Sequence, residues 1–366
     1  MKIGLLGTRG IPAAYGGFET LAEELATRLA SRGHDVTVYA RPASVAANVP
    51  RYRGVRVVHL PTLRYKYLDT VVHGVLSALH ASAEGYDAVL VCNAVNAVAS
   101  RLTRLLGAST RIVLNVDGLE RRRRKWNAAG RLAYALSERL SCVLPDATVT
   151  DARVIEEYYL RRYGTPTTFI PYGADLPVPE GTGTLSRLGL SPGGYLLYVS
   201  RFEPENNPDA VLRGFARYAG DLRLALVGSA PYAAGFIEKV QREASRDGRV
   251  VVPGPVYGEG YRELMANAAV YVHATEVGGT HPALLEAMGF GRPLLVHDTP
   301  ENREVAGETA VYWDARRPET LAEGLSALLS DPEERRKRGE AARARAEALY
   351  RWSDVADAYE RLLSGS

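Results

Sequence analysis

The chain has few cysteines and no long apolar run, and both absences narrow its class. Only two of the 366 residues are cysteines, Cys92 and Cys142, and they do not have the spacing of metal ligands. Nothing supports a disulfide, so a reducing cytosol is the expected compartment. No uninterrupted apolar stretch reaches the roughly 18 residues of a membrane-spanning helix. The opening MKIGLLGTRGIP breaks into glycine and proline before a signal-peptide core could form, so a cytoplasmic globular protein is expected.

Length and composition fit two domains of ordinary size. A hydrophobic share of 46% and a charged share of 24% are typical of globular proteins, and 366 residues allow two separate cores. The net charge of +3 is unevenly distributed, because residues 111–140 carry eight basic and three acidic side chains, a local net charge of +5. The basic excess is centred on RRRRKW at residues 121–126.

Short β-branched runs alternate with helix-length segments along the whole chain. The first half contains KIGLLG, DVTVYA, VRVVHL, DAVLVC, RIVLNV, ATVT and TTFIPYG, and the second contains YLLYVSR, LRLALVG, RVVVPG, VYVHAT, PLLVHD and AVYWD. Near-continuous apolar strands separated by helices predict parallel sheets covered on both faces. Between the halves, ADLPVPEGTGTLSRLGLSPGG has the composition of a linker. The sequence therefore predicts two doubly wound, Rossmann-like α/β domains, residues 1–175 and 190–345, followed by a C-terminal helix at 346–366.

The predicted last helix has apolar residues at helical spacing. Those expected to share its buried face are Val355, Ala358, Tyr359 and Leu362.

The loop after the first predicted strand, TRGIPAAYGGFET at residues 8–20, is rich in glycine. Gly16 and Gly17 stand just before a predicted helix, whose free N–H groups and positive dipole end suit a phosphate. Their lack of a Cβ allows a ligand to approach the backbone. The glycines do not have the GxGxxG spacing, so a dinucleotide is not favoured. A tight turn that binds nothing is the alternative.

Two loops of the second predicted domain carry further candidates. In SRFEPENNPD, Arg201 follows a strand, and its planar guanidinium suits a diphosphate. The alternative is a salt bridge to a neighbouring glutamate. In VGGTHPALLEAM, Gly278, Gly279 and Thr280 precede a predicted helix, which makes a second anion site. Glu286, one turn inside that helix, is placed to accept hydrogen bonds from hydroxyls, unless it is simply a solvated glutamate on an amphipathic helix.

The segment LNVDGLERRRRKWNAAG carries polar residues at a strand end and then the basic run. Asn115 and Asp117 are candidates for catalysis or substrate binding, and a helix cap is the alternative for Asp117. The basic run beside a tryptophan is either a solvated face or a contact for anionic lipid headgroups. Its members are Arg121, Arg122, Arg123, Arg124, Lys125 and Trp126. Basic density is too local to favour a nucleic acid.

Taken together, these segments resemble the retaining GT-B glycosyltransferases of family 4 along nearly the whole chain. The resemblance is carried by YGGFE, FIPYGAD, YVSRFEPENN, GPVYGEGYRELMANA, VGGTHPALLEAMGFGRP and YRWSDVADAYERL. More narrowly, GTRGIPAAYGGFET, NVDGLERRRRKW, RFEPENN and VGGTHPALLEAM resemble bacterial rhamnosyltransferases that extend lipid-linked sugar chains.

The resemblance implies both an architecture and a reaction. The two domains face each other across a cleft, and the C-terminal helix crosses back to the N-terminal domain. The expected reaction moves rhamnose from dTDP-rhamnose, with retention, to a polyprenyl-diphosphate-linked saccharide at the inner face of the plasma membrane. Neither a metal nor another cofactor is expected.

The resemblance also implies roles for individual residues. Arg201 would hold the donor diphosphate, Glu286 would bind the ribose hydroxyls, and Asp117 would orient the acceptor or handle its proton. The other donor-side positions are Gly16, Gly17, Asn206, Gly254, Tyr257, Gly278, Gly279 and Thr280.

Two positions depart from the broader family. Asn206 stands where a lysine is usual, and Gly278 stands where a glutamate is usual. The narrower subfamily itself has ENN and VGGT at these places, and we expect backbone amides and a helix dipole to replace the missing charge. Two other functions stay open: a nucleotide-sugar epimerase using His281 and Glu276, and a sugar-nucleotide-binding protein without catalysis.

Overall fold

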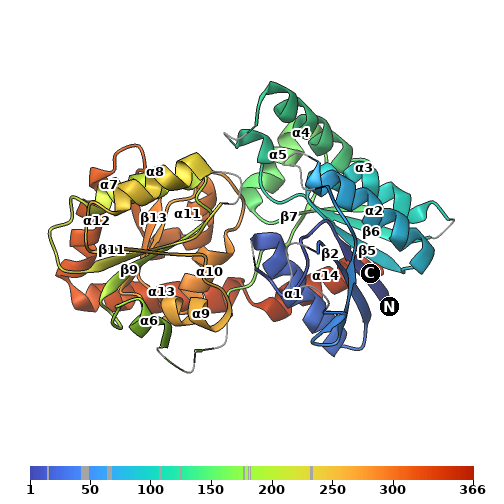
Figure 1. The fold of residues 1–366 in the computed structure, drawn as a ribbon. Helices are drawn as coiled ribbons and strands as arrows, with labels where there is room; N and C mark the ends of the chain where they lie inside the picture. Colours follow the sequence, from blue (N-terminus) through green and yellow to red (C-terminus); the bar gives the residue numbers. More distant parts are fainter. Residues whose placement is uncertain are drawn as a thin grey trace. The chain divides into compact units, whose positions relative to one another are not determined.

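The computed structural model describes two units of the chain. Its described residues are 1–14, 16–42, 49–63, 68–106, 109–123, 126–175, 178–179, 181, 183–230 and 234–366. Unit 1 comprises Met1–Tyr172 and Trp352–Ser366, and unit 2 comprises Gly173–Arg351. Each unit is a twisted sheet with helices on both faces (Figure 1).

The sheet of unit 1 is parallel except at one edge. Its strands run in the order β3-β4-β2-β1-β5-β6-β7-β8, and only β3 is antiparallel to its neighbour among the described pairs. Their bounds are β1 Lys2–Leu6, β2 Asp35–Ala40, β3 Arg51–Tyr52, β4 Val55–His59, β5 Ala88–Cys92, β6 Arg111–Asn115, β7 Ala147–Thr150 and β8 Thr168–Phe169. Every residue of β5 is buried, as expected for a central strand covered on both faces.

Helices connect these strands. They are α1 Gly17–Ser31, α2 Asp69–Glu84, α3 Ala97–Ser100, α4 Ala128–Ser141, α5 Arg153–Tyr163 and α14 Trp352–Ser364, with 3-10 turns η1 Ala94–Asn96, η2 Arg101–Arg104 and η3 Glu120–Arg122. Helix α1 buries Leu21, Leu25 and Leu29, which recur every fourth residue and form one apolar stripe.

The six-stranded sheet of unit 2 is parallel throughout. Its order is β11-β10-β9-β12-β13-β14, with β9 Tyr195–Val199, β10 Arg223–Val227, β11 Val250–Gly254, β12 Val270–His273, β13 Leu294–His297 and β14 Val311–Trp313. Its helices are α6 Gly183–Arg187, α7 Pro208–Phe215, α8 Ala234–Ala244, α9 Gly258–Asn267, α10 Pro282–Gly289, α11 Pro300–Ala306, α12 Glu319–Ser330 and α13 Pro332–Leu349, with 3-10 turns η4 Pro204–Asn206 and η5 Gly307–Thr309. Two doubly wound Rossmann-like units confirm the predicted fold class.

The last helix returns to unit 1, as the fold prediction required. The chain up to Leu349 still forms α13 of unit 2, and α14 begins at Trp352 and packs against α1, β5 and β6. The predicted buried face was partly wrong. Val355 and Tyr359 are buried, but Ala358 and Leu362 are only half-buried. Trp352, Ala356 and Leu363 complete the buried set, because the face that meets the sheet is rotated around the helix.

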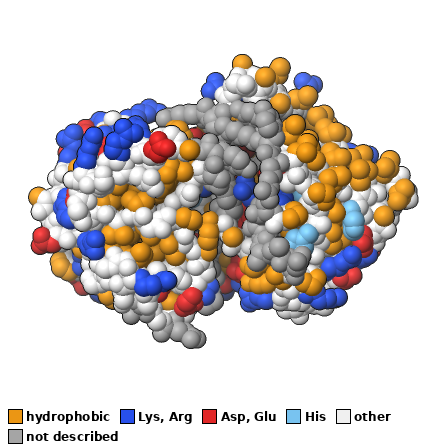
Figure 2. Space-filling model, in the orientation of Figure 1, with side chains coloured by type: hydrophobic (Ala, Val, Ile, Leu, Met, Phe, Trp, Pro, Cys, Tyr) orange, Lys and Arg blue, Asp and Glu red, His pale blue; other side chains and the backbone are white. Residues whose placement is uncertain are grey.

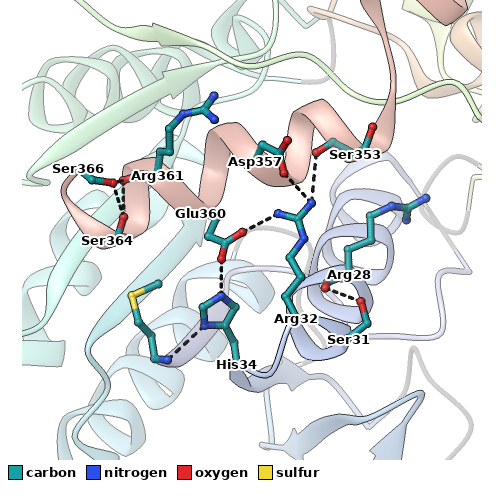
Figure 3. A network of polar contacts seen from close by, with 11 residues as sticks. Arg28, Ser31, Arg32, His34, Ser353, Asp357, Glu360, Arg361, Ser364 and Ser366 are labelled. Atoms are coloured by element: carbon teal, nitrogen blue, oxygen red, sulfur yellow. Dashed lines mark hydrogen bonds and ion pairs between the residues drawn. The ribbon is translucent and has the colours of Figure 1, made fainter.

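An ion network fastens α14 to the end of α1 and the start of β2 (Figure 3). Arg32 donates to Glu360 at 2.5 Å and lies 2.6 Å from a carboxylate oxygen of Asp357. His34 Nε2 lies 2.7 Å from the other oxygen of Glu360. Hydrogen bonds from His34 and Arg32 lower the pKa of Glu360 below the usual range of a glutamate.

We predict that Glu360→Gln lowers the thermal stability of the protein at pH 7. A carboxylate whose pKa is lowered by folding contributes stability above its unfolded pKa, and this contribution disappears as the pH falls through the folded pKa. The loss is expected to be at most about 1 kcal/mol, because the network is partly solvated. It should shrink below about pH 4, where the wild-type carboxylate also gains a proton.

Thermal unfolding at several pH values measures this effect. Glu347→Gln is the matched control, because Glu347 pairs with Arg343 within a single exposed helix. Equal losses of thermal stability in both variants would show that the network stabilises the protein no more than an ordinary surface ion pair does.

Candidate active site

The strand order of unit 2 brings two loops together at one edge of its sheet. Strands β9 and β12 are neighbours, and the chain leaves them toward opposite sides of the sheet. This is the topological switch point, where ligands of open α/β sheets bind beyond the carboxyl ends of the strands. The loop after β9 carries Arg201, and the loop after β12 carries Gly278 to Thr280. Arg201 and Gly278 to Thr280, which are far apart in sequence, thus lie at the same edge of the sheet.

Backbone and amide hydrogen bonds fix these two loops to each other. The amide of Glu276 donates to the carbonyl of Glu205 at 2.8 Å. The side-chain amide of Asn207 donates to the carbonyl of Ala274 at 2.9 Å, from a left-handed backbone at φ 52°. The loops therefore form one connected surface rather than two independent turns.

Arg201 is partly exposed within this surface. Its Nη2 lies 3.8 Å from Oε2 of Glu203, which is a long ion pair. Its backbone carbonyl accepts a hydrogen bond from Nδ2 of Asn206 at 2.7 Å. Asn206 is only 2% exposed, and its side-chain amide nitrogen supports the backbone of Arg201. The lysine usual at this place is replaced by a residue that positions the loop.

Glu286 is buried, and a tyrosine from the neighbouring helix donates to it. The carboxylate is 7% exposed and accepts a hydrogen bond from the hydroxyl of Tyr261 on α9. Burial raises the pKa of Tyr261, so the phenol keeps its proton and acts as the donor. The alternative of a solvated glutamate is wrong for this residue.

Gly278 lies against the imidazole of His281. A Cβ added at Gly278 would lie 2.2 Å from Cε1 of His281, far inside normal contact. His281 is the N-cap residue of α10, and its ring centroid is 4.9 Å from that of His273. Burial lowers the pKa of His273, which is therefore a neutral neighbour. The glycine is required here because the His281 ring occupies the space that a side chain would need.

The carboxyl end of β11 reaches the same edge of the sheet. Gly254 ends this strand at φ 83°, a conformation that favours glycine, and Tyr257 is a half-exposed residue just before α9. All the predicted donor-side residues of unit 2 therefore lie at one edge of one sheet.

In unit 1, the loop after β1 folds back onto its own helix. The amide of Arg9 donates to Glu19 at 2.8 Å, and the amide of Ala13 donates to Glu23 at 2.5 Å. Gly16 is the extended N-cap residue of α1, and its carbonyl accepts from the amides of Glu19 and Thr20 at 3.1 and 3.2 Å. The amides of Gly17 and Phe18 precede the first hydrogen bonds of the helix, so they are the candidate anion donors at the start of α1.

Asn115 and Asp117 occupy the carboxyl end of β6. Asn115 is buried, donates to the hydroxyl of Tyr359 at 2.7 Å, and accepts from the amide of Asp117 at 2.9 Å. Asp117 has a left-handed backbone at φ 58°, and η3 begins only at Glu120. The helix-cap alternative for Asp117 is therefore wrong.

Sequence reasoning missed four residues at these edges. Asp151 is fully buried after β7, and Tyr172 has its pKa raised by burial and by the nearby charges of Asp117 and Asp151. The sequence signal for Asp151 was an acid directly after a strand, in ATVTD. Tyr261 and the buried Asn302, which donates to the carbonyls of Thr275 and His297, gave no such signal.

The described part of the basic run is turned into unit 1. Nε of Arg121 lies 3.1 Å from the buried carboxylate of Glu138, and Arg123 is buried and pairs with Glu120 at 2.5 Å. The Trp126 ring lies 4.8 Å from that of Tyr134. Arg124, Lys125 and the side chain of Arg122 lie outside the described residues. A fully solvated face is therefore the wrong description of Arg121 and Arg123.

The described ranges hold no group of three or more His, Cys, Asp or Glu side chains arranged to bind a metal ion. None of their helices combines the length and apolarity that a bilayer crossing needs.

The architecture matches that of solved structures. The sucrose-phosphate synthase of Thermosynechococcus elongatus superposes with a TM-score of 0.83 at 21% identity, covering 100% of both chains. HepE of Anabaena, solved in complex with UDP and glucose, superposes with a TM-score of 0.80 at 16% identity, again over 100% of both chains. The chain therefore has the GT-B fold.

Sequence comparison then defines the family. The Glycosyltransferase Family 4 model matches residues 15–177, and the Glycosyl transferases group 1 model matches residues 191–345. The chain is 27% identical to the D-inositol 3-phosphate glycosyltransferase of Xylanimonas cellulosilytica, over 94% of this chain and 90% of that protein. It is 25% identical to the alpha-maltose-1-phosphate synthase of Mycolicibacterium smegmatis, over 98% and 97%. The protein is a GT-B glycosyltransferase of the group 1 and family 4 type.

We predict an energetic coupling between Gly278 and His281. Gly278→Ala should cost on the order of 1 kcal/mol of stability, because the His281 ring must leave its preferred position. The same change should cost almost nothing in a His281→Ala background. A double-mutant cycle by urea unfolding measures the difference. Gly235→Ala, where an added Cβ meets open space, is the control and should show no coupling to His281.

Proposed function

We propose that the protein transfers a sugar, rhamnose from dTDP-rhamnose, to a lipid-linked saccharide in bacterial surface polysaccharide synthesis, with retention. The observation that carries the proposal is the meeting of Arg201, Gly278 to Thr280 and Glu286 at the switch point of unit 2. The HepE complexes with UDP and UDP-glucose support a nucleoside-diphosphate sugar as the donor. The choice of rhamnose rests on the resemblance of four sequence segments.

The proposed reaction needs stabilisation of a leaving diphosphate. The bond from the anomeric carbon to the diphosphate oxygen breaks, the acceptor oxygen bonds to the same face of that carbon, and its proton passes to the leaving phosphate. Positive charge develops on the sugar ring, as in glycoside hydrolysis, while negative charge grows on the diphosphate. Positioned donors that strengthen with this charge lower the barrier. No nucleophile from the protein is required.

Arg201 and the start of α10 supply those donors in our proposal. The guanidinium, which follows strand β9 at the switch point, offers a planar pair of donors to phosphate oxygens. Backbone amides at Gly278, Gly279 and Thr280 lie at the positive end of the α10 dipole. A negative charge at such a helix end is stabilised by about 0.3–1 kcal/mol. These groups compensate for the lysine charge that Asn206 does not provide.

Glu286 and Tyr261 form the proposed ribose site. A buried carboxylate needs hydrogen bonds to remain ionised, and Tyr261 supplies one. The carboxylate then accepts from sugar hydroxyls, while Tyr261 acts as a positioning residue. Tyr257, half-exposed before α9, is the proposed neighbour of the base. On the acceptor side, Asp117 is the proposed orienting group, and the approach of Gly16 and Gly17 to the diphosphate stays a prediction.

The test is transfer itself. Purified protein should release nucleoside diphosphate from dTDP-rhamnose only when a polyprenyl-diphosphate-linked saccharide is present, with the product identified by mass spectrometry. Arg201→Gln should lower kcat on the order of a hundredfold, the usual cost of removing a donor that strengthens in the transition state. Arg213→Gln, which breaks an exposed pair with Asp209, is the matched control and should leave kcat unchanged.

Other outcomes identify other functions. Change of the donor sugar without an acceptor would indicate an epimerase. Tight donor binding without turnover on any acceptor of a broad panel would indicate a binding protein.

We also predict that transfer needs no divalent metal, because the arginine and the helix amides already neutralise the diphosphate. Activity should be the same, within about twofold, before and after dialysis against EDTA. Loss of activity that returns with Mg²⁺ or Mn²⁺ would overturn this expectation.

A further inference from the structure

Helix α4 of unit 1 exposes apolar side chains along one stripe. Leu132 is 73% exposed and Leu136 is 56% exposed, and they lie one turn apart on the same side of the helix. Val143, seven residues beyond Leu136 and just after the helix ends, is 70% exposed. An amphipathic helix normally turns such residues toward the core, so this stripe needs another explanation.

The stripe continues onto neighbouring elements. Val98 on α3 and Leu105 and Leu106 after η2 are exposed, and α3 packs against both α4 and η2. Figure 2 shows hydrophobic side chains gathered over the part of unit 1 where Figure 1 labels α4, α3 and α2. A connected apolar patch, unlike scattered single residues, marks an interaction surface. We name the α4 surface as Val98, Leu105, Leu106, Leu132, Leu136 and Val143.

The segment that carries the α4 surface has a positive net charge. Residues 94–146 carry ten basic and four acidic side chains, a net charge of +6, against +3 for the whole chain. Three of the four acids are paired within unit 1: Glu120 with Arg123, Glu138 with Arg121, and Asp146 with Arg104. The exposed charged side chains on α4, α3 and η2 are Arg101, Arg131 and Arg139.

Exposed leucines bordered by arginines favour one kind of partner, an anionic bilayer. Leucines that enter the boundary between headgroups and acyl chains, bordered by arginines that reach phosphates, are typical of a protein that binds an anionic bilayer surface. A second copy of the chain fits less well, because a symmetric contact of this face with itself would bring like charges together.

We propose that the α4 surface is a docking surface for an anionic lipid bilayer. The proposed membrane contact does not include Arg121 and Arg123 at the start of the basic run, because these side chains form ion pairs within unit 1. It deepens the proposed function, because a lipid-linked acceptor must be reached at a membrane. The binding itself needs neither donor nor acceptor and can be measured alone.

The test is sedimentation of the full chain with vesicles of phosphatidylcholine alone, or with vesicles in which about one lipid in three is phosphatidylglycerol. The double variant Leu132→Ser and Leu136→Ser should lower binding to the anionic vesicles on the order of tenfold. Its matched control is Leu160→Ser with Leu349→Ser, which removes two leucines that are 53% and 52% exposed on α5 and α13. The control should bind like the wild type.

A second pair separates charge from apolar contact. Arg131→Gln with Arg139→Gln should weaken binding to the anionic vesicles and reduce its salt dependence, with little effect on phosphatidylcholine vesicles. Unchanged thermal unfolding of each variant shows that the fold is intact.

The outcomes are distinct. Unchanged vesicle binding by the folded leucine variant overturns the inference, and so does a leucine-dependent change from dimer to monomer in light scattering without vesicle binding. Transfer to a short water-soluble acceptor should be normal in the leucine variant. Vesicle binding by a protein that transfers no sugar would overturn the proposed function and leave the docking surface standing.

Discussion

The pairing of β9 with β12 is the constraint on which the donor side of the molecule depends. These strands are neighbours in space although about 70 residues separate their ends, and the chain leaves them toward opposite sides of the sheet. The two loops that follow these strands are bonded to each other, through Glu276 to Glu205 and Asn207 to Ala274.

That constraint explains why buried polar groups gather at this edge. Glu286, Asn206 and Asn302 are all buried, and each hydrogen-bonds to a residue that lies in or beside the two loops. A buried polar group is costly unless it is paired, so these pairings set the loops in one arrangement. Groups held in this way need not be ordered when a ligand binds.

The sequence was sufficient for the fold but only for part of the site. The thirteen predicted strand runs all contain strands, because apolar, β-branched segments between helices leave few alternatives. Strand β3 was missed, because its two residues are too few to show a run of apolar or β-branched side chains. The positions of Arg201 and Gly278 could be predicted, because both residues lie in loops that directly follow recognisable strands. The roles of Asn206 and Tyr261 did not, because they depend on which atom each side chain meets across the fold.

The return of α14 to unit 1 has a consequence for how the chain is made. Residues 352–366 are synthesised after all of unit 2, yet Trp352 and Tyr359 are buried in unit 1, most of which is synthesised before unit 2. During translation, the docking site of α14 on unit 1 stays uncovered while residues 173–351 are made. A chain that stops before Trp352 therefore leaves this site of unit 1 open.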